Sequence, residues 1–405
     1  MDISTLLLYA KQYVPYYSSL LMPDIPDIHS FPIINKNKYI TNSSSFLSVL
    51  ADKSKMKEIK TSGSTGTPMS VYKSNKDYML QLRCLWQKRY MFHGISPNDR
   101  CINFIMSEYQ PSQGINSPSI DNKTMSLSIN AIEENIERWI PDIQLFQPSY
   151  IIGYPSVISI FADALAKAKS SFPDSVLHIE CMGEFLFPSQ QRLIEDIFGK
   201  KIINYYGCTE VFGIAYSCEM GKLHILGNNV YVEVIPSGEK VSHYGREGNI
   251  VITGLNSVEA PFIRYDLEDV GVIYKGSECS CGCQDDFIEI TMSRMFQNIQ
   301  ISPDRHVHSS IFYGFIEAIN ASLDQSIYWF KFLQEDFHIY TLYIQLKTGY
   351  EIFLAEIEKR ITLLMRRHLG ESLIVKVIHK THRRESSNNK KHEFIESTMR
   401  SACLG

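Results

Sequence analysis

The stretch Thr61-Ser62-Gly63-Ser64-Thr65-Gly66-Thr67-Pro68 carries the most information about the fold. Strand-like residues precede it at Glu58–Lys60 and follow it at Met69–Tyr72. A loop of small residues and hydroxyls can turn successive backbone N–H groups toward one point, which is what a polyphosphate requires. It is not the GxxxxGK(S/T) phosphate loop, because no lysine follows the second glycine and the next element is strand-like. A flexible Ser/Gly/Thr linker would have the same composition, so the segments that follow must decide between the two.

Length, charge and cysteine content limit the class of protein that this chain can be. A chain of 405 residues is longer than one hydrophobic core usually serves, so two folded units are expected. Lys and Arg total 40 against 44 Asp and Glu, and the first basic run comes in the last thirty residues, so we expect small-molecule substrates and no nucleic-acid or membrane partner. The apolar stretch Leu6–Ala10 is too short for a membrane span and lacks a cleavage site. Nine cysteines, several of them single within apolar segments, are typical of the reducing cytoplasm.

Helix-like and strand-like segments alternate over most of the chain, which predicts an α/β architecture. After a lead-in of about sixty residues, helices are expected from Asn75, as N-cap, and over Ser156–Lys169. Buried strands are expected at Tyr150–Ile152, Ile202–Tyr206 and Asn249–Thr253. These segments predict a large N-terminal α/β domain over residues 1–292.

Beyond about residue 295 the pattern changes to a compact set of strands and helices. Strands are expected at Ile327–Phe330, Leu342–Leu346 and Leu373–Ile378, with a helix from about Tyr350 to a stop at Gly370. The pattern predicts a smaller C-terminal α+β domain over residues 298–405. The polar tract Arg383–Lys391 lacks apolar periodicity and is expected to be a mobile loop.

Two further segments have the chemistry of a nucleotide site. In Tyr205–Glu210 (YYGCTE), at the end of a predicted strand, an aromatic face could stack on adenine, Thr209 could donate to a phosphate and Glu210 could bind Mg²⁺. In Arg264–Asp269 (RYDLED), a carboxylate could accept hydrogen bonds from a ribose diol. Each is weak alone, because a strand end with a turn glycine and an Asp-rich turn are both common.

The order of these segments is more specific than any one of them. TSGSTGTP, then Gly183-Glu184, then YGCTE, RYDLED, Ser293-Arg294 and a late basic loop resemble the motif sequence of the adenylate-forming enzymes. The lead-in, with Tyr13–Tyr17 and Phe31–Lys36, is similar to that of phenylacetate-CoA ligases and related capsule-biosynthesis (CapK-like) proteins. The resemblance covers nearly the whole chain and implies an ATP- and Mg²⁺-dependent ligase that activates a carboxylic acid as its acyl-AMP.

The resemblance also implies roles for individual residues. Glu210 would bind magnesium, Thr209 the α-phosphate, Asp269 the ribose hydroxyls and Arg294 the ribose or phosphate side. Lys391, with Lys390 as a close alternative, would match the late lysine that steadies the carboxylate and the α-phosphate. The remaining nucleotide-binding positions are the phosphate-loop residues Ser62, Gly63, Ser64, Thr65, Gly66 and Thr67, the adenine-site residues Gly183 and Glu184, and Tyr206, which packs on the base, with Gly207.

The chain departs from the family at the hinge between the two domains. Where the family has Gly-Arg-x-Asp-Asp, residues 293–297 are Ser-Arg-Met-Phe-Gln, so both aspartates are absent. Ser386–Asn389 also replaces the usual Ser-Gly before the late lysine. These changes leave the acyl acceptor open between a thiol of CoA or a carrier protein, an amine and a hydroxyl. They also leave open a non-catalytic homologue that binds a nucleotide or an acid.

A set of cysteines and one histidine suggests a metal site. Cys218 and His224 from one expected hairpin, with Cys279 and Cys281 from another, would make the closed tetrahedral set of a structural zinc. Buried or redox-inactive cysteines are the alternative. In the resembled family a Cys-x-Cys-Gly turn sits at Cys279 and Cys281, and Cys283 is either a substitute ligand or a bystander.

The sequence does not identify the acid. Aromatic-rich segments at Asn103–Tyr109 and Ile152–Pro155 favour an aryl acid, although core packing explains the same aromatics nearly as well. The assembly state is also open, with a homodimer as one option.

Overall fold

A computed structural model describes residues 2–61, 69–105, 118–128, 132–170, 172–239, 241–292, 298–380 and 395–398. Within it the chain forms two compact units, residues 1–97 with 203–294 and residues 98–202 with 295–405. The division into domains at 1–292 and 298–405, with a hinge at 293–297, stays a prediction.

The first unit begins with three short helices, α1 (Ile3–Tyr13), α2 (Pro15–Ser18) and α3 (Lys36–Thr41). Asp2 caps α1 by accepting a hydrogen bond from the Thr5 backbone N–H at 3.0 Å, and Asn35 caps α3 in the same way. The lead-in then packs through aromatic rings: Tyr39 stacks on Phe46 and on Phe262, with centroids 5.0 and 4.8 Å apart. This packing makes the lead-in part of the unit's core.

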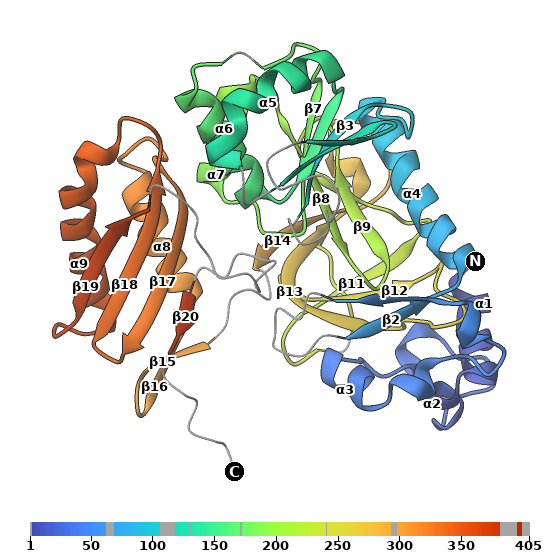
Figure 1. The fold of residues 1–405 in the computed structure, drawn as a ribbon. Coiled ribbons are helices and arrows are strands. Elements are labelled where there is room, and N and C mark those ends of the chain that lie inside the picture. The colour runs from blue at the N-terminus through green and yellow to red at the C-terminus, as the bar shows by residue number, and fades with distance from the viewer. Residues whose placement is uncertain are drawn as a thin grey trace. The chain divides into compact units, whose positions relative to one another are not determined.

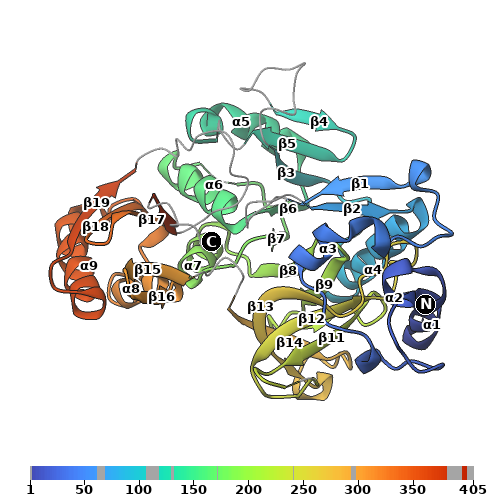
Figure 2. The same cartoon turned by 90° about the horizontal axis from the view of Figure 1, so that it is seen from below.

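A two-stranded antiparallel ribbon carries the glycine-rich loop. It consists of β1 (Lys57–Lys60) and β2 (Ser70–Lys73), which are both labelled in Figure 2. These two strands confirm the ones expected on either side of the loop. The ends of the loop are tied together, because the Thr61 N–H donates to the Met69 carbonyl and the Met69 N–H donates to Thr61 Oγ1, both at 2.9 Å. Residues 62–68 lie outside the described part of the chain.

Helix α4 (Asn75–His93) follows directly. Its N-cap is Ser74, whose hydroxyl accepts from the Asp77 N–H at 3.1 Å, so the prediction that Asn75 is the cap was one residue late. Gly94, at φ 67°, ends the helix in the left-handed conformation. Met79, Leu82, Trp86 and Tyr90 recur at the spacing of a helix, but this spacing does not mark the buried face of α4. Met79 and Tyr90 are exposed, whereas Gln81 and Lys88 are buried.

Most strands of the first unit pair antiparallel. Their order across the sheet is β11-β12-β13-β14-β10-β9-β8. The bounds are β8 (Ile202–Cys208), β9 (Phe212–Ser217), β10 (Leu223–Ile225), β11 (Val230–Ile235), β12 (Gly248–Gly254), β13 (Tyr265–Tyr274) and β14 (Phe287–Met292). The strands expected at Ile202–Tyr206 and Asn249–Thr253 are therefore confirmed as β8 and β12.

The second unit contains the parallel part of the fold. Its strands are β3 (Cys101–Ile105), β4 (Ser119–Asp121), β5 (Thr124–Ser128), β6 (Tyr150–Gly153) and β7 (His178–Met182), in the order β7-β6-β3-β5-β4. Only β4 pairs antiparallel among the pairings described here. Helices α5 (Ile132–Phe146), α6 (Pro155–Lys167) and α7 (Pro188–Phe198) belong to the same core. The predicted strand at Tyr150–Ile152 and helix at Ser156–Lys169 are confirmed.

The same unit ends in a small sheet with the order β19-β18-β17-β20. Its elements are β15 (Asn298–Ser302), β16 (Arg305–His308), α8 (Ser310–Asn320), β17 (Ile327–Asp336), β18 (Ile339–Leu346), α9 (Leu354–Leu369), β19 (Ile374–His379) and β20 (Ile395–Ser397). Helices α8 and α9 contact each other and share one apolar core with the strands (Figure 1). The helix expected from Tyr350 begins at Leu354, after a short 3₁₀ turn at Glu351–Phe353, and ends before Gly370 as predicted.

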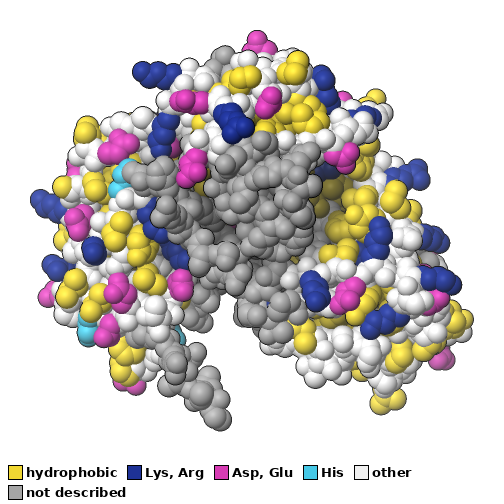
Figure 3. All heavy atoms as spheres, in the orientation of Figure 1, with side chains coloured by type: hydrophobic (Ala, Val, Ile, Leu, Met, Phe, Trp, Pro, Cys, Tyr) yellow, Lys and Arg dark blue, Asp and Glu magenta, His cyan; other side chains and the backbone are white. Residues whose placement is uncertain are grey.

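These elements confirm the predicted fold class, α/β with a smaller α+β part. Among the described residues, no helix combines the length and the apolar character that a bilayer crossing requires. On the face shown in Figure 3, basic and acidic side chains are interspersed over the described surface.

Candidate functional site

Two motifs that lie apart in the sequence are joined by a hydrogen bond between side chains. Tyr206 on β8 donates its hydroxyl to Asp269 Oδ2 on β13 at 2.7 Å, although β9, β10 and β14 lie between these strands in the sheet order. Asp269 is buried, and it lies within the strand rather than in a turn. A carboxylate has several lone pairs, so one that already accepts a hydrogen bond can accept further bonds from a diol.

The turn after β8 holds the residues predicted to contact the phosphate and the magnesium. Thr209 and Glu210 lie between β8 and β9, and Glu210 is buried. The turn requires Gly207, because a Cβ there would lie 2.1 Å from the Phe212 carbonyl oxygen. Lys73, which the sequence analysis missed, donates from Nζ to the backbone carbonyl of Glu210 at 2.6 Å.

Gly183 and Glu184 lie in the other unit, directly after β7. Gly183 has a φ of 77°, and a Cβ there would approach the Tyr154 ring to 2.6 Å. Glu184 Oε2 accepts from the Ser156 N–H, in the first turn of α6, at 3.2 Å. Burial, and secondarily the Glu184 carboxylate, raises the pKa of the Tyr154 phenol. Tyr154 was predicted to line the acid pocket, and the structure places its ring against the Gly183 backbone.

Several predicted site residues cannot be compared with the structure. They lie outside its described residues and comprise the phosphate-loop residues Ser62, Gly63, Ser64, Thr65, Gly66 and Thr67, the hinge residue Arg294, and the late lysine Lys391 with its alternative Lys390. The structure describes Thr61 and Met69, which flank the loop. The roles of the residues outside the described part of the chain stay predictions.

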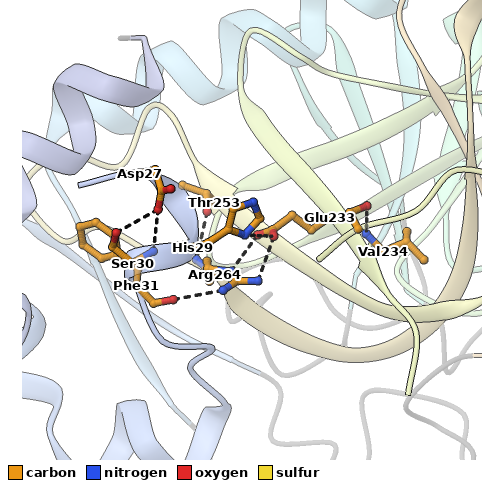
Figure 4. A network of polar contacts seen from close by, with 9 residues as sticks. Asp27, His29, Ser30, Phe31, Glu233, Val234, Thr253 and Arg264 are labelled. Carbon is orange, nitrogen blue, oxygen red and sulfur yellow. Dashed lines mark hydrogen bonds and ion pairs between the residues drawn. The ribbon is translucent and has the colours of Figure 1, made fainter. Parts of the chain in front are cut away.

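A buried ion pair supports the start of β13 (Figure 4). Arg264 donates from Nε and Nη2 to the two carboxylate oxygens of Glu233, at 3.1 and 3.0 Å, and from Nη1 to the Phe31 carbonyl at 3.2 Å. Burial raises the pKa of Glu233, and the hydrogen bonds and charge of Arg264 oppose that rise. Arg264 itself adopts φ 49°, a conformation that costs free energy unless surrounding contacts hold it. The pair therefore ties the lead-in to the strand that carries Asp269.

Four potential metal ligands converge in the first unit. The ligand atoms of Cys218, His224, Cys279 and Cys281 all lie within 4.8 Å of one another. His224 contacts the Asp285 carbonyl through Nδ1 at 2.7 Å and Cys281 Sγ through Nε2 at 3.2 Å. A proton on Nδ1 donated to that carbonyl leaves Nε2 as the ligand atom, which is the usual support of a metal-binding histidine.

The surroundings shift the pKa of three of these four groups. Burial raises the pKa of the Cys218 thiol to about 11, and burial lowers the pKa of His224, which keeps the imidazole neutral. Burial acts to raise the pKa of Cys279, but hydrogen bonds from Cys281 and Cys218 outweigh it and lower that pKa. Cys283 is not in the converging set, and its backbone N–H donates to Cys281 Sγ at 3.4 Å. Its role, as a substitute ligand or a bystander, stays a prediction.

Comparison with known proteins places the chain in a family. The AMP-binding enzyme family matches residues 59–259, which include the glycine-rich loop and the Glu210 turn. Protein CapK of Staphylococcus aureus is 23% identical over 275 residues, which are 64% of this chain and 59% of CapK, so the match spans less than two thirds of that relative.

Solved structures show the same fold at low identity. A 2-hydroxyisobutyryl-CoA ligase in the postadenylation state superposes with a TM-score of 0.71 at 13% identity, covering 97% of this chain and 87% of the ligase. The anthranilate CoA ligase AuaEII, in complex with anthranoyl-AMP, superposes with a TM-score of 0.54 at 12% identity, covering 85% and 67%. The chain belongs to the AMP-binding superfamily of adenylate-forming enzymes.

Proposed function

We propose that the protein activates a small carboxylic acid, with an aryl acid favoured, as its acyl-AMP at the expense of ATP. The observation that carries this proposal is the hydrogen bond between Tyr206 and Asp269, because it joins the predicted adenine-stacking residue to the predicted ribose carboxylate. The glycine-rich loop between β1 and β2 and the Glu210 turn come from the same unit, as one nucleotide site requires.

In the first half-reaction, a carboxylate oxygen attacks the α-phosphorus of ATP. The bond from that phosphorus to the bridging oxygen of the β-phosphate breaks, and pyrophosphate leaves. Two anions must approach each other, so charge neutralisation and positioning supply most of the catalysis. No protein nucleophile is needed.

Each residue then has a defined task. Ser62–Thr67 would bind the phosphates, and Thr209 would donate to the α-phosphate. Tyr206 and Asp269 would hold the adenosine, with Gly207 keeping the turn narrow.

The cations would come from several places. Glu210 would hold Mg²⁺, which supplies charge neutralisation when it is bound. Lys391 and Arg294 would bring further positive charge to the carboxylate and the α-phosphate. Gly183 and Glu184 would complete the adenine side.

Fewer observations bear on the acyl acceptor of the second half-reaction than on the adenylation step. A structurally similar 2-hydroxyisobutyryl-CoA ligase has been seen with an acyl-AMP and CoA, which makes CoA one option. In this chain the hinge positions hold Phe296 and Gln297 in place of two aspartates. We therefore propose that CoA is a poor acceptor here, and that a carrier-protein thiol, an amine or a hydroxyl receives the acyl group.

We also propose that the four converging ligands hold one structural zinc ion. Three thiolates and one imidazole match the closed tetrahedral sets of structural zinc sites, in which protein groups fill all four positions. Cys218 follows β9, His224 is on β10 and Cys279 and Cys281 precede β14, so the ion would fasten the connections of neighbouring strands. Its role would be in folding, not in catalysis.

Product analysis tests the reaction class. The protein is incubated with ATP, Mg²⁺ and each member of a panel of aryl and short aliphatic acids, and the nucleotides are separated. We expect acyl-AMP and pyrophosphate to form only with cognate acids. Formation of ADP and phosphate would overturn the proposal. Binding of ATP without any product would favour the non-catalytic homologue.

A further inference from the structure

Two buried side chains hold the backbone of the turn that contains Glu210. Lys73 donates from Nζ to the carbonyl of Glu210 at 2.6 Å. Asn229 donates from Nδ2 to the carbonyls of Val211 and Gly213, at 2.9 and 2.7 Å. Three carbonyls within four consecutive residues are thus fixed by groups from distant parts of the chain.

The two side chains belong to one hydrogen-bonded network. Gln81 on α4 accepts from Lys73 Nζ at 2.6 Å and donates to the Asn256 carbonyl at 3.2 Å and to Ser257 Oγ at 2.8 Å. Asn256 in turn donates to Asn229 Oδ1 at 3.1 Å. All these side chains are buried. A buried polar network whose members are paired rigidifies the segment that it grips.

The turn needs such support. Phe212 has a φ of 58°, and a bulky residue in this region persists only when its surroundings determine it. The Lys73 ammonium also lies 4.5 Å from the centre of the Phe212 ring. The Lys73 ammonium thus contacts the side-chain oxygen of Gln81, the main-chain oxygen of Glu210 and the face of the Phe212 ring.

The charge of Lys73 calls for an explanation. An apolar side chain of the same length would fill this site without the cost of taking an ammonium out of water. The ammonium is held on the Glu210 carbonyl, and Lys73 is the last residue of β2, the strand that leaves the glycine-rich loop. The lysine therefore joins β2 to the turn that carries the residues predicted to bind the phosphate and the magnesium.

We propose that Lys73 is a positioning residue that holds the backbone of the turn carrying Thr209 and Glu210 at the end of β2. This inference rests on the proposed adenylation. In this proposal Lys73 acts through the turn and not by contact with a substrate. The rate of adenylation depends on it because small displacements of groups that align reactants are costly.

The test compares Lys73→Met with Lys73→Arg and Gln81→Met. Methionine keeps the length of the side chain and removes the donor, arginine keeps a donor, and Gln81→Met removes the anchor of the lysine. We expect Lys73→Met to lower kcat for acid-dependent ATP–pyrophosphate exchange about 10- to 100-fold while KM for the acid stays within about twofold. Lys73→Arg should recover part of the loss, and Gln81→Met should show a smaller loss in the same direction.

Lys88→Met is the matched control, since Lys88 is also a buried lysine but pairs with Asp285, away from the turn. It should keep kcat per folded molecule. Amide hydrogen exchange gives a readout that does not need turnover: in Lys73→Met the amides of residues 208–213 should exchange faster, whereas those of β11 and β12 should not.

The two proposals fail in different ways. If the unmodified protein shows no exchange of pyrophosphate with any acid, the proposed function fails, and the hydrogen-exchange comparison still decides whether Lys73 holds the turn. If the unmodified protein is active, and Lys73→Met and Gln81→Met keep their kcat, the positioning role is refuted. Should Lys73→Met not fold, Gln81→Met carries the same comparison. Equal amide exchange of residues 208–213 in Lys73→Met and in the unmodified protein would also refute the positioning role.

Discussion

Replacing Arg264 with methionine should destabilise the first unit by far more than an average substitution. The side chains of Arg264 and Glu233 are 5% and 1% exposed, and the pair is bidentate. Removing Arg264 leaves the buried Glu233 carboxylate with the more distant His29, whose Nδ1 is 3.9 Å from Glu233 Oε1. Breaking a buried ion pair by removing one partner costs about 3–5 kcal/mol. The Phe31 carbonyl also loses its donor.

A double variant isolates the ion pair from the rest. In Glu233→Met/Arg264→Met both charges of the pair are removed, so most of the penalty should vanish. The remaining loss should be about 1 kcal/mol, mainly from the hydrogen bond to the Phe31 carbonyl. Lys in place of Arg264 keeps the charge without the planar fork and should fall between the two.

The penalty should depend on pH. Burial raises the pKa of Glu233, and Arg264 opposes that rise, so in Arg264→Met the folded-state pKa rises further. An acid with a raised folded pKa contributes its full stability below its unfolded pKa, about 4.3, and loses that contribution as pH rises through the folded pKa. The difference between the unmodified protein and Arg264→Met should therefore be smaller at about pH 5 than at about pH 8.

Urea unfolding followed by far-UV circular dichroism, with hydrogen exchange of β12 and β13 amides, measures these differences. The exchange data assign the loss to the strands that the pair supports. A double variant as unstable as Arg264→Met, or a single variant within about 1 kcal/mol of the unmodified protein, would refute the reasoning.

Three other sets of substitutions test the site. Protein purified without chelator should contain close to one zinc per chain, and Cys281→Ser should lower both the zinc content and the thermal stability, whereas Cys283→Ser should keep the zinc; metal-free protein of equal stability would remove the site. Tyr206→Phe removes the hydroxyl that donates to Asp269 and should raise KM for ATP about 5- to 10-fold, a loss of about 1 kcal/mol, and an unchanged KM would separate Tyr206 from the nucleotide. Lys391→Ala should depress acyl-AMP formation by about two to three orders of magnitude. Normal adenylation by both Lys391→Ala and Lys390→Ala would contradict that role, and efficient CoA-thioester formation by the unmodified protein would contradict the proposed acceptor.

The elements with strong local patterns could be predicted from the sequence. Several elements appear close to their expected positions because short apolar runs and turn residues determine them locally: the strands around the glycine-rich loop, β12, α6, and β17, β18 and β19 of the small sheet. Strand β20 of that sheet was not predicted. The convergence of Cys218, His224, Cys279 and Cys281 was also predicted, since the donor types themselves limit the possible pairings.

Contacts between distant segments could not be predicted. Lys73 and Glu210 are 137 residues apart, and Arg264 and Phe31 are 233 apart, so no spacing in the sequence links them. The polar buried face of α4 was equally hidden, because Gln81 and Lys88 look like solvent-exposed residues in a periodic helix. They are buried because carbonyls and carboxylates from other elements pair with them.

Acid-dependent exchange of labelled pyrophosphate into ATP tests the central claim most directly, because it requires a reversible acyl-AMP and no acceptor. The unmodified protein and Glu210→Gln are compared over the same panel of acids at several Mg²⁺ concentrations. We predict exchange with a subset of aryl acids by the unmodified protein. Glu210→Gln should exchange more slowly and should need more Mg²⁺, because an amide is a weaker ligand for the ion than a carboxylate. No exchange by the unmodified protein with any acid of the panel, or an equal rate in Glu210→Gln at every Mg²⁺ concentration, would contradict the account.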